Sequence, residues 1–255
     1  MTTAEAVSSR FEMGRVVSRT FGVLGRNFVV FALLSLVVAG IPVALVNYFS
    51  EVGAAGSPYD AHLGSAIMNL ISLLASCVLQ AALIHGTISD LNGRKAVFGD
   101  SLGTGMRFLL PVLGVSILTG IAVVLGFVLL IIPGVLMSLA WCVNVPVVVV
   151  ERKGVTATFS RSADLTRGSR WPILGLIIAY ILVAFVIDIV GVAAARGFSA
   201  GGLLATGFNP VEWVVMTVVQ VAQALIGAAG IASIYYELRS NKEGVSAHQL
   251  ASVFD

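Results

Sequence analysis

Charged residues are scarce in this chain of 255 residues. They make up 11% of the sequence, against about 25% in ordinary soluble domains, while hydrophobic residues make up 58%, against roughly 45–50%. One water-soluble core cannot bury that much apolar surface, because too few polar residues would remain to cover it. The composition therefore excludes an ordinary soluble domain and predicts that a lipid bilayer is the solvent for much of the chain.

Cysteine, histidine and catalytic motifs are equally sparse. The two cysteines, Cys77 and Cys142, fall within apolar runs, which argues against a disulfide framework or a metal cluster. The three histidines, His62, His85 and His248, are scattered over both predicted sides of the membrane. No Walker loop, no Gly-x-Ser-x-Gly elbow and no His-Glu-x-x-His spacing is found. We therefore expect no metal, no cofactor and no enzymatic activity.

Long apolar runs are what the chain does contain. A helix needs about 20 apolar residues to cross the hydrocarbon. The runs are too long for barrel strands and do not alternate as those strands do. Six of them predict transmembrane helices: 28–49, 63–86, 108–132, 135–150, 172–195 and 211–236. We expect an all-α polytopic bundle that forms one membrane domain over 1–255, with a tail from 237 to 255.

Three features predict breaks in these helices. Pro133-Gly134 predicts a tight turn between the third and fourth spans. Asn144 and Pro146 interrupt the fourth span, and Gly40-Ile41-Pro42 can bend the first, because proline removes a backbone donor. Broken helices build sites in transporters, but bent helices also occur without transport.

The basic residues predict the orientation. All fifteen Lys and Arg residues except Arg196 lie in four places: the N-terminal segment, the loops 94–107 and 152–170, and the segment after residue 236. Basic residues near the ends of spans stay in the cytoplasm. Both termini are therefore expected to be cytoplasmic.

A short amphipathic helix is predicted before each pair of spans. The chain therefore divides into three repeated units, each an amphipathic helix followed by two spans, over 9–90, 94–151 and 152–240. The first of these helices, over 9–26, places Met13, Val17, Phe21 and Leu24 on one face. Such helices are expected to lie in the interface with their basic faces near anionic headgroups. The candidate headgroup-facing residues are Arg15, Arg19, Arg26, Arg107, Arg161 and Arg167. The alternative is that these helices only cover the ends of the bundle.

Ionisable and amide side chains inside the spans are the other candidates for a site. Asp188 lies within the fifth span, where an acid costs about 2.5–3.5 kcal/mol on insertion scales. Gln220 and Gln223 lie at a similar depth in the sixth span. The three residues form either an interhelical hydrogen bond or a site for a proton, a cation or a polar substrate. Asp188 could instead pair with Arg196 or point outward.

Three stretches resemble one group of bacterial membrane proteins. They are Phe11-Glu-Met-Gly-Arg-Val-Val-Ser-Arg-Thr-Phe21 with Arg26-Asn27-Phe28, then Trp141-Cys-Val-Asn-Val-Pro146 through Leu165-Thr-Arg-Gly168, and Tyr235-Tyr-Glu-Leu-Arg239 before Lys242. Together they resemble the glycerophosphoryl diester phosphodiesterase membrane-domain and YciC-like group. The resemblance implies a six-span protein of the bacterial inner membrane. The phosphodiesterase activity belongs to a separate catalytic domain, for which this chain has no room.

The partners expected from these patterns are membrane lipids, chiefly anionic headgroups on the cytoplasmic side, and not nucleic acid. The small residues Gly191 and Ala195 indicate close helix packing, either within the chain or in a homo-oligomer or with another membrane protein. We expect a non-enzymatic membrane protein with a structural, lipid-interacting or partner-binding role. The alternatives are a small transporter or channel that uses Asp188 with Gln220 and Gln223, and a membrane-embedded lipid enzyme.

Overall fold

The computed structural model describes residues 11–42, 45, 58–197 and 210–243, and these form helices joined by short turns, with no strand among them. The elements are α1 (Met13–Arg26), α2 (Phe28–Ser35), the π-helical segment η1 (Leu36–Gly40), α4 (Pro58–Leu91), α5 (Phe98–Arg107), α6 (Leu109–Leu129), α7 (Ile131–Ala140), α8 (Asn144–Glu151), α9 (Val155–Thr166), α10 (Arg170–Gly197) and α11 (Pro210–Glu243). The predicted all-α fold is confirmed.

Five stretches in the described part of the chain are long and apolar enough to cross a membrane. They are Ala66–Leu91, Leu109–Leu129, Ile131–Glu151, Arg170–Gly197 and Val214–Glu243. The segments Met13–Arg26 and Phe28–Gly40 pass the same test together, bent by 83°, and can supply a sixth span. The chain is therefore a polytopic helical membrane bundle. Most of the last predicted segment, 237–255, lies outside the described residues, although α11 continues through Glu243.

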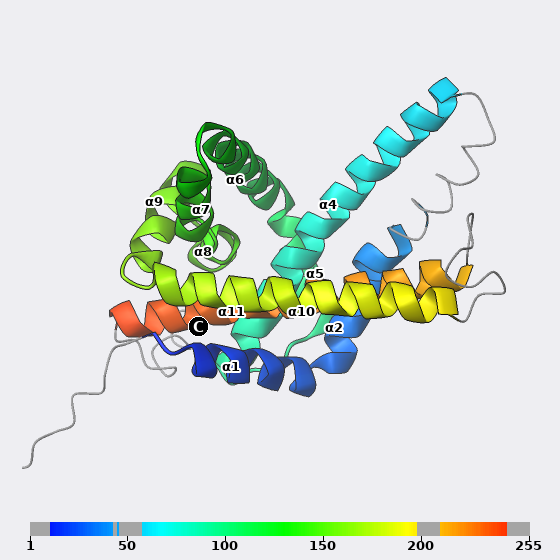
Figure 1. Ribbon diagram of the computed structural model, residues 1–255. Coiled ribbons are helices and arrows are strands. Elements are labelled where there is room, and N and C mark those ends of the chain that lie inside the picture. Colours follow the sequence, from blue (N-terminus) through cyan, green and yellow to red (C-terminus); the bar gives the residue numbers. More distant parts are fainter. Residues whose placement is uncertain (1–10, 43–44, 46–57, 198–209, 244–255) are drawn as a thin grey trace, which may run out of the picture.

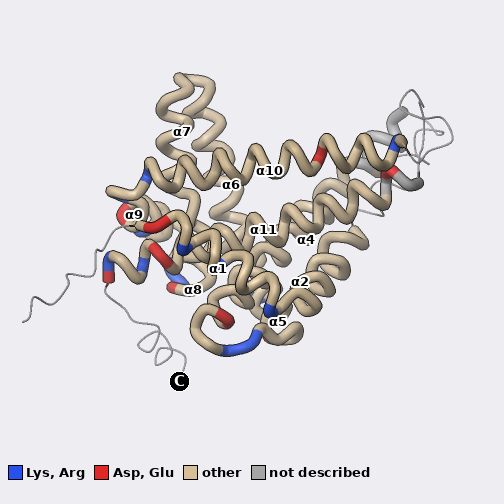
Figure 2. Tube along the Cα trace, turned by 60° about the horizontal axis from the view of Figure 1, so that its bottom comes forward, with Lys and Arg blue, Asp and Glu red and all other residues tan. Residues whose placement is uncertain are grey.

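The helices converge at one end and splay apart at the other. Helices α10 and α11 run side by side across the molecule, while α4 and the α6–α7 hairpin leave them in different directions (Figure 1). Buried residues concentrate where the helices meet, for example Ile84 of α4, Val112 of α6, Val147 of α8 and Ala232 of α11. We call this the basic end, because α1, α5, α9 and the last turns of α4 and α11 bring their charged residues to it (Figure 2). The core thus ties the spans together at the basic end.

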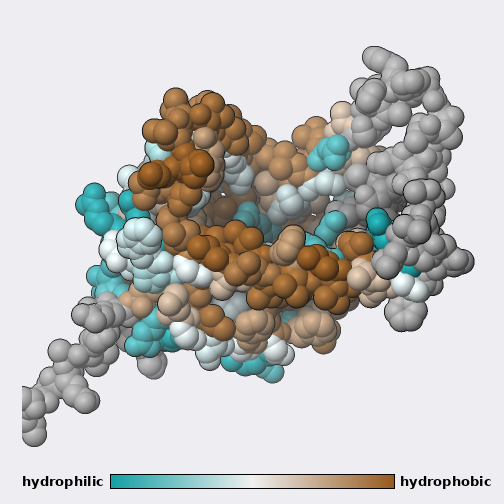
Figure 3. Space-filling view, in the orientation of Figure 1, coloured by the Kyte–Doolittle hydropathy of each residue, from teal (hydrophilic) through white to brown (hydrophobic). Residues whose placement is uncertain are grey.

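The splayed parts present apolar side chains outward. Brown, hydrophobic atoms cover α10 and the α6–α7 hairpin in the space-filling view (Figure 3). Exposed residues include Ile121 and Val128 of α6 and Val186 of α10. In water such a surface would be unstable, but it matches the hydrocarbon of a bilayer.

The turn between the third and fourth spans lies at Leu130, so the predicted turn at Pro133-Gly134 is wrong. Leu130 is extended, with φ −164° and ψ 145°, and α7 begins immediately after it. Pro133 is the third residue of α7, where its missing N–H leaves no helical hydrogen bond unmade. Gly134 has a packing role instead: a Cβ there would lie 2.5 Å from Cγ of Phe127, so the ring needs a glycine opposite it.

The other two predicted breaks fall close to the observed ones. The fourth span is interrupted at 141–143, and Asn144 begins α8, with Pro146 in its first turn. In the first span, the π-helical segment η1 ends at Gly40, directly before Ile41 and Pro42. A π-helical turn widens the backbone locally and shifts the faces that follow it.

Helix α1 lies at the basic end with its apolar stripe outward. Val16, Thr20 and Val23 are buried against the bundle. Met13, Val17 and Phe21 are exposed to 47%, 43% and 58%. The helix therefore packs through a narrow edge, and of the predicted apolar face Leu24 contacts the core while Met13, Val17 and Phe21 stay about half exposed.

Candidate functional site

The intramembrane acid Asp188 is bonded to the neighbouring span. Gln223 of α11 donates from Nε2 to Asp188 Oδ1 of α10 at 2.9 Å, and the same nitrogen lies 3.3 Å from the carbonyl oxygen of Ala184. The hydroxyl of Tyr180 donates to the backbone carbonyl oxygen of Gln223 at 3.1 Å. The three contacts join α10 to α11 within the apolar stretch Arg170–Gly197.

Arg196, the alternative partner considered for Asp188, makes its ion pair elsewhere. Its guanidinium lies 3.2 Å from Glu212 Oε1, at the end where α10 and α11 are connected. Gly191, one turn after Asp188, lets α11 approach closely, since a Cβ there would lie 3.0 Å from Met216 and 3.1 Å from Val219. This small residue of α10 therefore serves packing within the chain.

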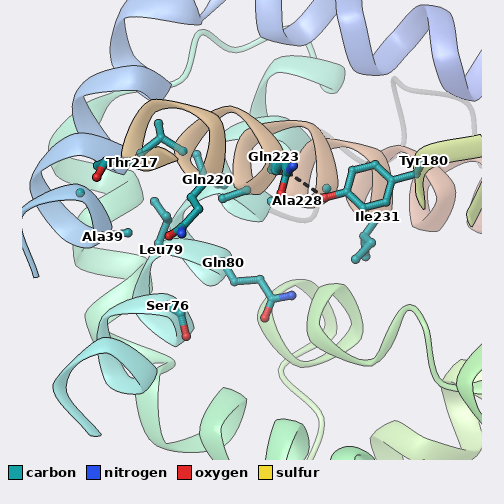
Figure 4. Close-up of a pocket in the computed structure, with 15 residues that line it drawn as sticks. Ala39, Ser76, Leu79, Gln80, Tyr180, Thr217, Gln220, Gln223, Ala228 and Ile231 are labelled. Atoms are coloured by element: carbon teal, nitrogen blue, oxygen red, sulfur yellow. Dashed lines mark hydrogen bonds between the residues drawn. The ribbon is translucent and has the colours of Figure 1, made fainter. Parts of the chain in front are cut away.

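A cavity of about 460 Å³ adjoins this hydrogen-bonded contact. Its walls come from η1, α4, α10 and α11, and most of its lining is apolar. In the close-up, the side chains of Gln80 and Gln220 extend into this space, whereas Asp188 is not among the residues drawn around it (Figure 4). Ser76, Tyr180, Thr217 and Gln223, the residue bonded to Asp188, complete the polar lining. The structure therefore brings Gln223 to Asp188 and directs Gln220 to the cavity.

The chemistry of the cavity is hydrogen bonding. Among its described lining residues the polar groups are amides and hydroxyls. Such groups bind an alcohol, an ester or an amide, but they do not form the acid–base pair that general acid–base catalysis requires. No group of three metal-ligating side chains was found among the described residues. The described geometry thus suits binding.

At the basic end, arginines that were expected to face lipid headgroups bind carboxylates of the protein. Arg19 of α1 forms an ion pair with Glu237 of α11, and Arg15 Nη1 lies 3.5 Å from the same carboxylate. The Glu237 side chain is fully buried, and Asn241 donates to its Oε1 at 3.3 Å. Arg19 also lies over the ring of Tyr236, with 5.0 Å from Cζ to the ring centroid. The first and last described helices are joined here by charge.

A second ion-pair cluster surrounds Glu151, the last residue of α8. Arg161 of α9 donates from Nε to both carboxylate oxygens, at 2.9 and 3.0 Å. Tyr235 of α11 donates to Oε1 at 3.1 Å, and Lys153 lies 3.1 Å from Oε2. Arg161 also pairs with Glu243 near the end of α11. This cluster fixes α8 and α9 against α11.

The third cluster joins the start of the first span to the end of the second. Arg26 pairs with Asp90, and Asn27 donates to the same carboxylate at 2.7 Å. The backbone N–H of Ala96 donates to Asn27 Oδ1 at 3.2 Å. The hydrogen bonds to Asp90 raise the pKa of Arg26 above its ordinary value, although partial burial opposes the shift.

Of the six candidate headgroup residues, Arg15, Arg19, Arg26 and Arg161 thus bind carboxylates, while Arg107 and Arg167 are exposed. Sequence reasoning missed the acidic partners Asp90, Glu151 and Glu237. One signal was available: in a chain with so little charge, each of these acids lies at or just beyond the end of a predicted span. An acid in that position can neutralise a basic helix.

Taken together, the apolar surface, the span lengths and the buried ion pairs define a polytopic helical membrane protein. The chain is 26% identical over 171 residues to a UPF0259 membrane protein of Pectobacterium carotovorum subsp. carotovorum (strain PC1), covering 56% of this chain and 68% of that protein. No family model matches the chain, and no solved structure matches it. The similarity supports an assignment to bacterial membrane proteins, and the relative's name gives no activity.

Proposed function

We propose that this chain is a non-enzymatic protein of the bacterial inner membrane that interacts with lipid through its basic end, with both termini in the cytoplasm. The observation that carries the proposal is the position of α1. This helix is bent 83° from the segment that follows it, and Met13, Val17 and Phe21 are about half exposed on its outer side. A helix perpendicular to a span lies in the plane of the interface.

The energetics favour lipid contact for this stripe. Transfer of three half-exposed side chains of this size out of water stabilises the bound position by about 1 kcal/mol each. Arg15 and Arg19 lie on the other side of the helix, where both form ion pairs with Glu237. Trp171, 83% exposed in the first turn of α10, suits the same interface, where tryptophan is enriched. The helix thus faces lipid with its apolar residues and faces protein with its charges.

Site-directed spin labelling tests this position. In a background where Cys77 and Cys142 are replaced by alanine, Val17→Cys and Ser18→Cys place the label on adjacent residues about 100° apart around α1. Both positions are exposed. In liposomes we expect the label at 17 to be accessible to oxygen and the label at 18 to a water-soluble nickel complex. Equal access of the nickel complex to both labels would show that α1 lies in water and would refute the proposal.

A small transporter or channel is the second candidate, and one observation favours it. The 460 Å³ cavity places Gln80 and Gln220 beside the π-helical segment of the first span, inside the apolar region. Asp188→Asn keeps an oxygen that accepts the hydrogen bond from Gln223 but removes the charge. Loss of solute flux in proteoliposomes, with folding intact, would support an ionisation-dependent transport site. Equal flux in protein-containing and empty liposomes would leave Asp188 as an interhelical contact.

A further inference from the structure

A second cavity lies at the basic end, apart from the intramembrane cavity. Its volume is about 650 Å³. It is enclosed by the last turns of α4, the loop that follows, α5, and the end of α8 with the residue after it. Four cationic side chains line it, against the single carboxylate of Asp100: Arg94, Lys95, Arg107 and Arg152.

Three of these cations, Lys95, Arg107 and Arg152, differ from the paired arginines of the basic end. Arg15, Arg19, Arg26 and Arg161 are held by carboxylates, as described above. Within the described ranges, no carboxylate lies within 4.0 Å of Lys95, Arg107 or Arg152. Three cations gathered around one cavity repel one another. An anion that enters between them therefore lowers the free energy of the folded chain.

Two neutral features of the cavity also suit an anion. Helix α5 begins at its wall: Val97 is the N-cap without a side-chain hydrogen bond, and Gly99 and Asp100 of the first turn line the cavity. The free N–H groups of a helix N-terminus carry partial positive charge. His85, which also lines the cavity, has a buried Nδ1 that lacks a hydrogen-bond partner. A ligand oxygen can therefore find donors on several sides.

Apolar side chains lie next to the cationic ones. Phe108 and Val97 line the cavity, and Val97 is exposed. Met106 and Leu110, on either side of Arg107 and Phe108 in the chain, are exposed to 60% and 75%. A ligand that places an anion in the cavity and hydrocarbon on these residues would bury both groups favourably. Phospholipids have this combination.

We propose that this cavity binds the phosphate group of an anionic phospholipid, with Lys95, Arg107 and Arg152 as the principal contacts. The inference rests on the proposed function, since it supplies a specific headgroup site for a protein that interacts with lipid at this end. Arg15, Arg19, Arg26 and Arg161 contribute instead through their ion pairs to folding. The arginines and lysine of the cavity provide the selectivity for anionic over zwitterionic headgroups.

Thermal unfolding of the full chain in detergent, titrated with short-chain lipids, tests the site. We expect phosphatidylglycerol to raise the unfolding temperature at lower concentration than phosphatidylcholine does. Lys95→Gln/Arg107→Gln should raise the phosphatidylglycerol concentration needed by roughly tenfold or more, since each Lys or Arg near an anionic surface strengthens binding by a factor of about five. Without lipid, this variant should unfold at the same temperature as the wild type or slightly above it, because neither residue is in an ion pair and their mutual repulsion is removed.

The matched control is Arg167→Gln/Lys242→Gln, which removes the same charges from exposed positions at the same end. It should leave the phosphatidylglycerol titration unchanged. An equal loss in the control would reduce the effect to diffuse surface charge and overturn the site, as would an unchanged titration in Lys95→Gln/Arg107→Gln. Inorganic phosphate is the third arm: if it stabilises as well as the lipid does, the ligand is a free phosphate and the lipid source is wrong.

The failure of this site is distinguishable from failure of the proposed function. Spin labels at Val17 and Ser18 report the position of α1 and do not depend on the cavity. A lipid-facing label at 17 together with no preference for phosphatidylglycerol would overturn the headgroup site and leave the proposed function standing.

Discussion

The ion pair between Arg19 and Glu237 can be measured by a double-mutant cycle. Glu237 has no exposed side-chain surface, and Arg19 is 26% exposed at its side chain. The cycle compares Arg19→Gln, Glu237→Gln and the double variant with the wild type. The same cycle on Arg196 and Glu212 is the control, because that pair lies at the other end and is 41% and 27% exposed.

The expected magnitude follows from burial. A second cation, Arg15, lies 3.5 Å from Glu237, where the Coulomb attraction amounts to about 4–5 kcal/mol at an effective dielectric constant of about 20. Desolvation offsets most of this attraction while all partners are present. Loss of one partner of a buried pair costs about 3–5 kcal/mol, because the remaining charge is left uncompensated. We expect the cost of Arg19→Gln in unfolding free energy to lie near the lower end of this range, since Arg15 still offsets part of the charge of the Glu237 carboxylate.

Unfolding by sodium dodecyl sulfate in mixed micelles gives the four free energies of each cycle. We expect a coupling of about 2 kcal/mol or more for Arg19 with Glu237, and at most about 1 kcal/mol for Arg196 with Glu212, as for other exposed pairs. Equal couplings in the two cycles would refute the reasoning, because burial would then have no effect on the strength of the pair.

Three further local contacts can be tested by the same unfolding measurement. Gly105→Ala should destabilise the protein by about 1–3 kcal/mol, since its Cβ would lie 2.5 Å from a carbonyl oxygen of α4. Gly103→Ala in the same helix is the control: its Cβ would meet nothing within 4 Å, so this variant should stabilise the protein slightly. Equal effects of the two substitutions would contradict the close approach of α4 and α5. Tyr235→Phe should cost about 1–3 kcal/mol, because the buried Glu151 carboxylate loses a donor at 3.1 Å. Gln223→Leu should cost about 0.6–2 kcal/mol, the range for hydrogen bonds between membrane helices, and no loss would show that this bond does not hold α10 to α11.

The fold could be predicted because insertion into a membrane depends on local composition. Within the described residues, the apolar runs predicted to span the hydrocarbon correspond to helices or helix pairs. The helix ends could not be predicted as well. Helix α11 continues through Glu243, where the apolar signal has stopped but Arg239 and Glu243 still pair one turn apart. The turn at Leu130 was missed because no glycine or proline marks it.

The contacts of the candidate site were predictable only where their residues lie on consecutive helices. Helices α10 and α11 form a hairpin, so Asp188 and Gln223 could be expected to meet. Arg19 and Glu237 are separated by 218 positions, and their contact depends on how the whole bundle packs. The amphipathic pattern of α1 separated its basic residues from its apolar residues. It could not show that Arg15 and Arg19 both form ion pairs with the buried Glu237.

The link between α1 and α11 also has a consequence for the time course of biosynthesis. A ribosome adds about 5–20 residues per second. Glu237 is therefore synthesised roughly 10–40 s after Arg19, which lies 218 positions earlier in the chain. During that interval its charge has no partner from α11, and anionic lipid or another protein of the insertion machinery can hold it. Only the last helix closes the cluster, so a chain truncated before α11 leaves Arg19 without the carboxylate of Glu237, although Arg15 and Arg26 keep Glu12 and Asp90.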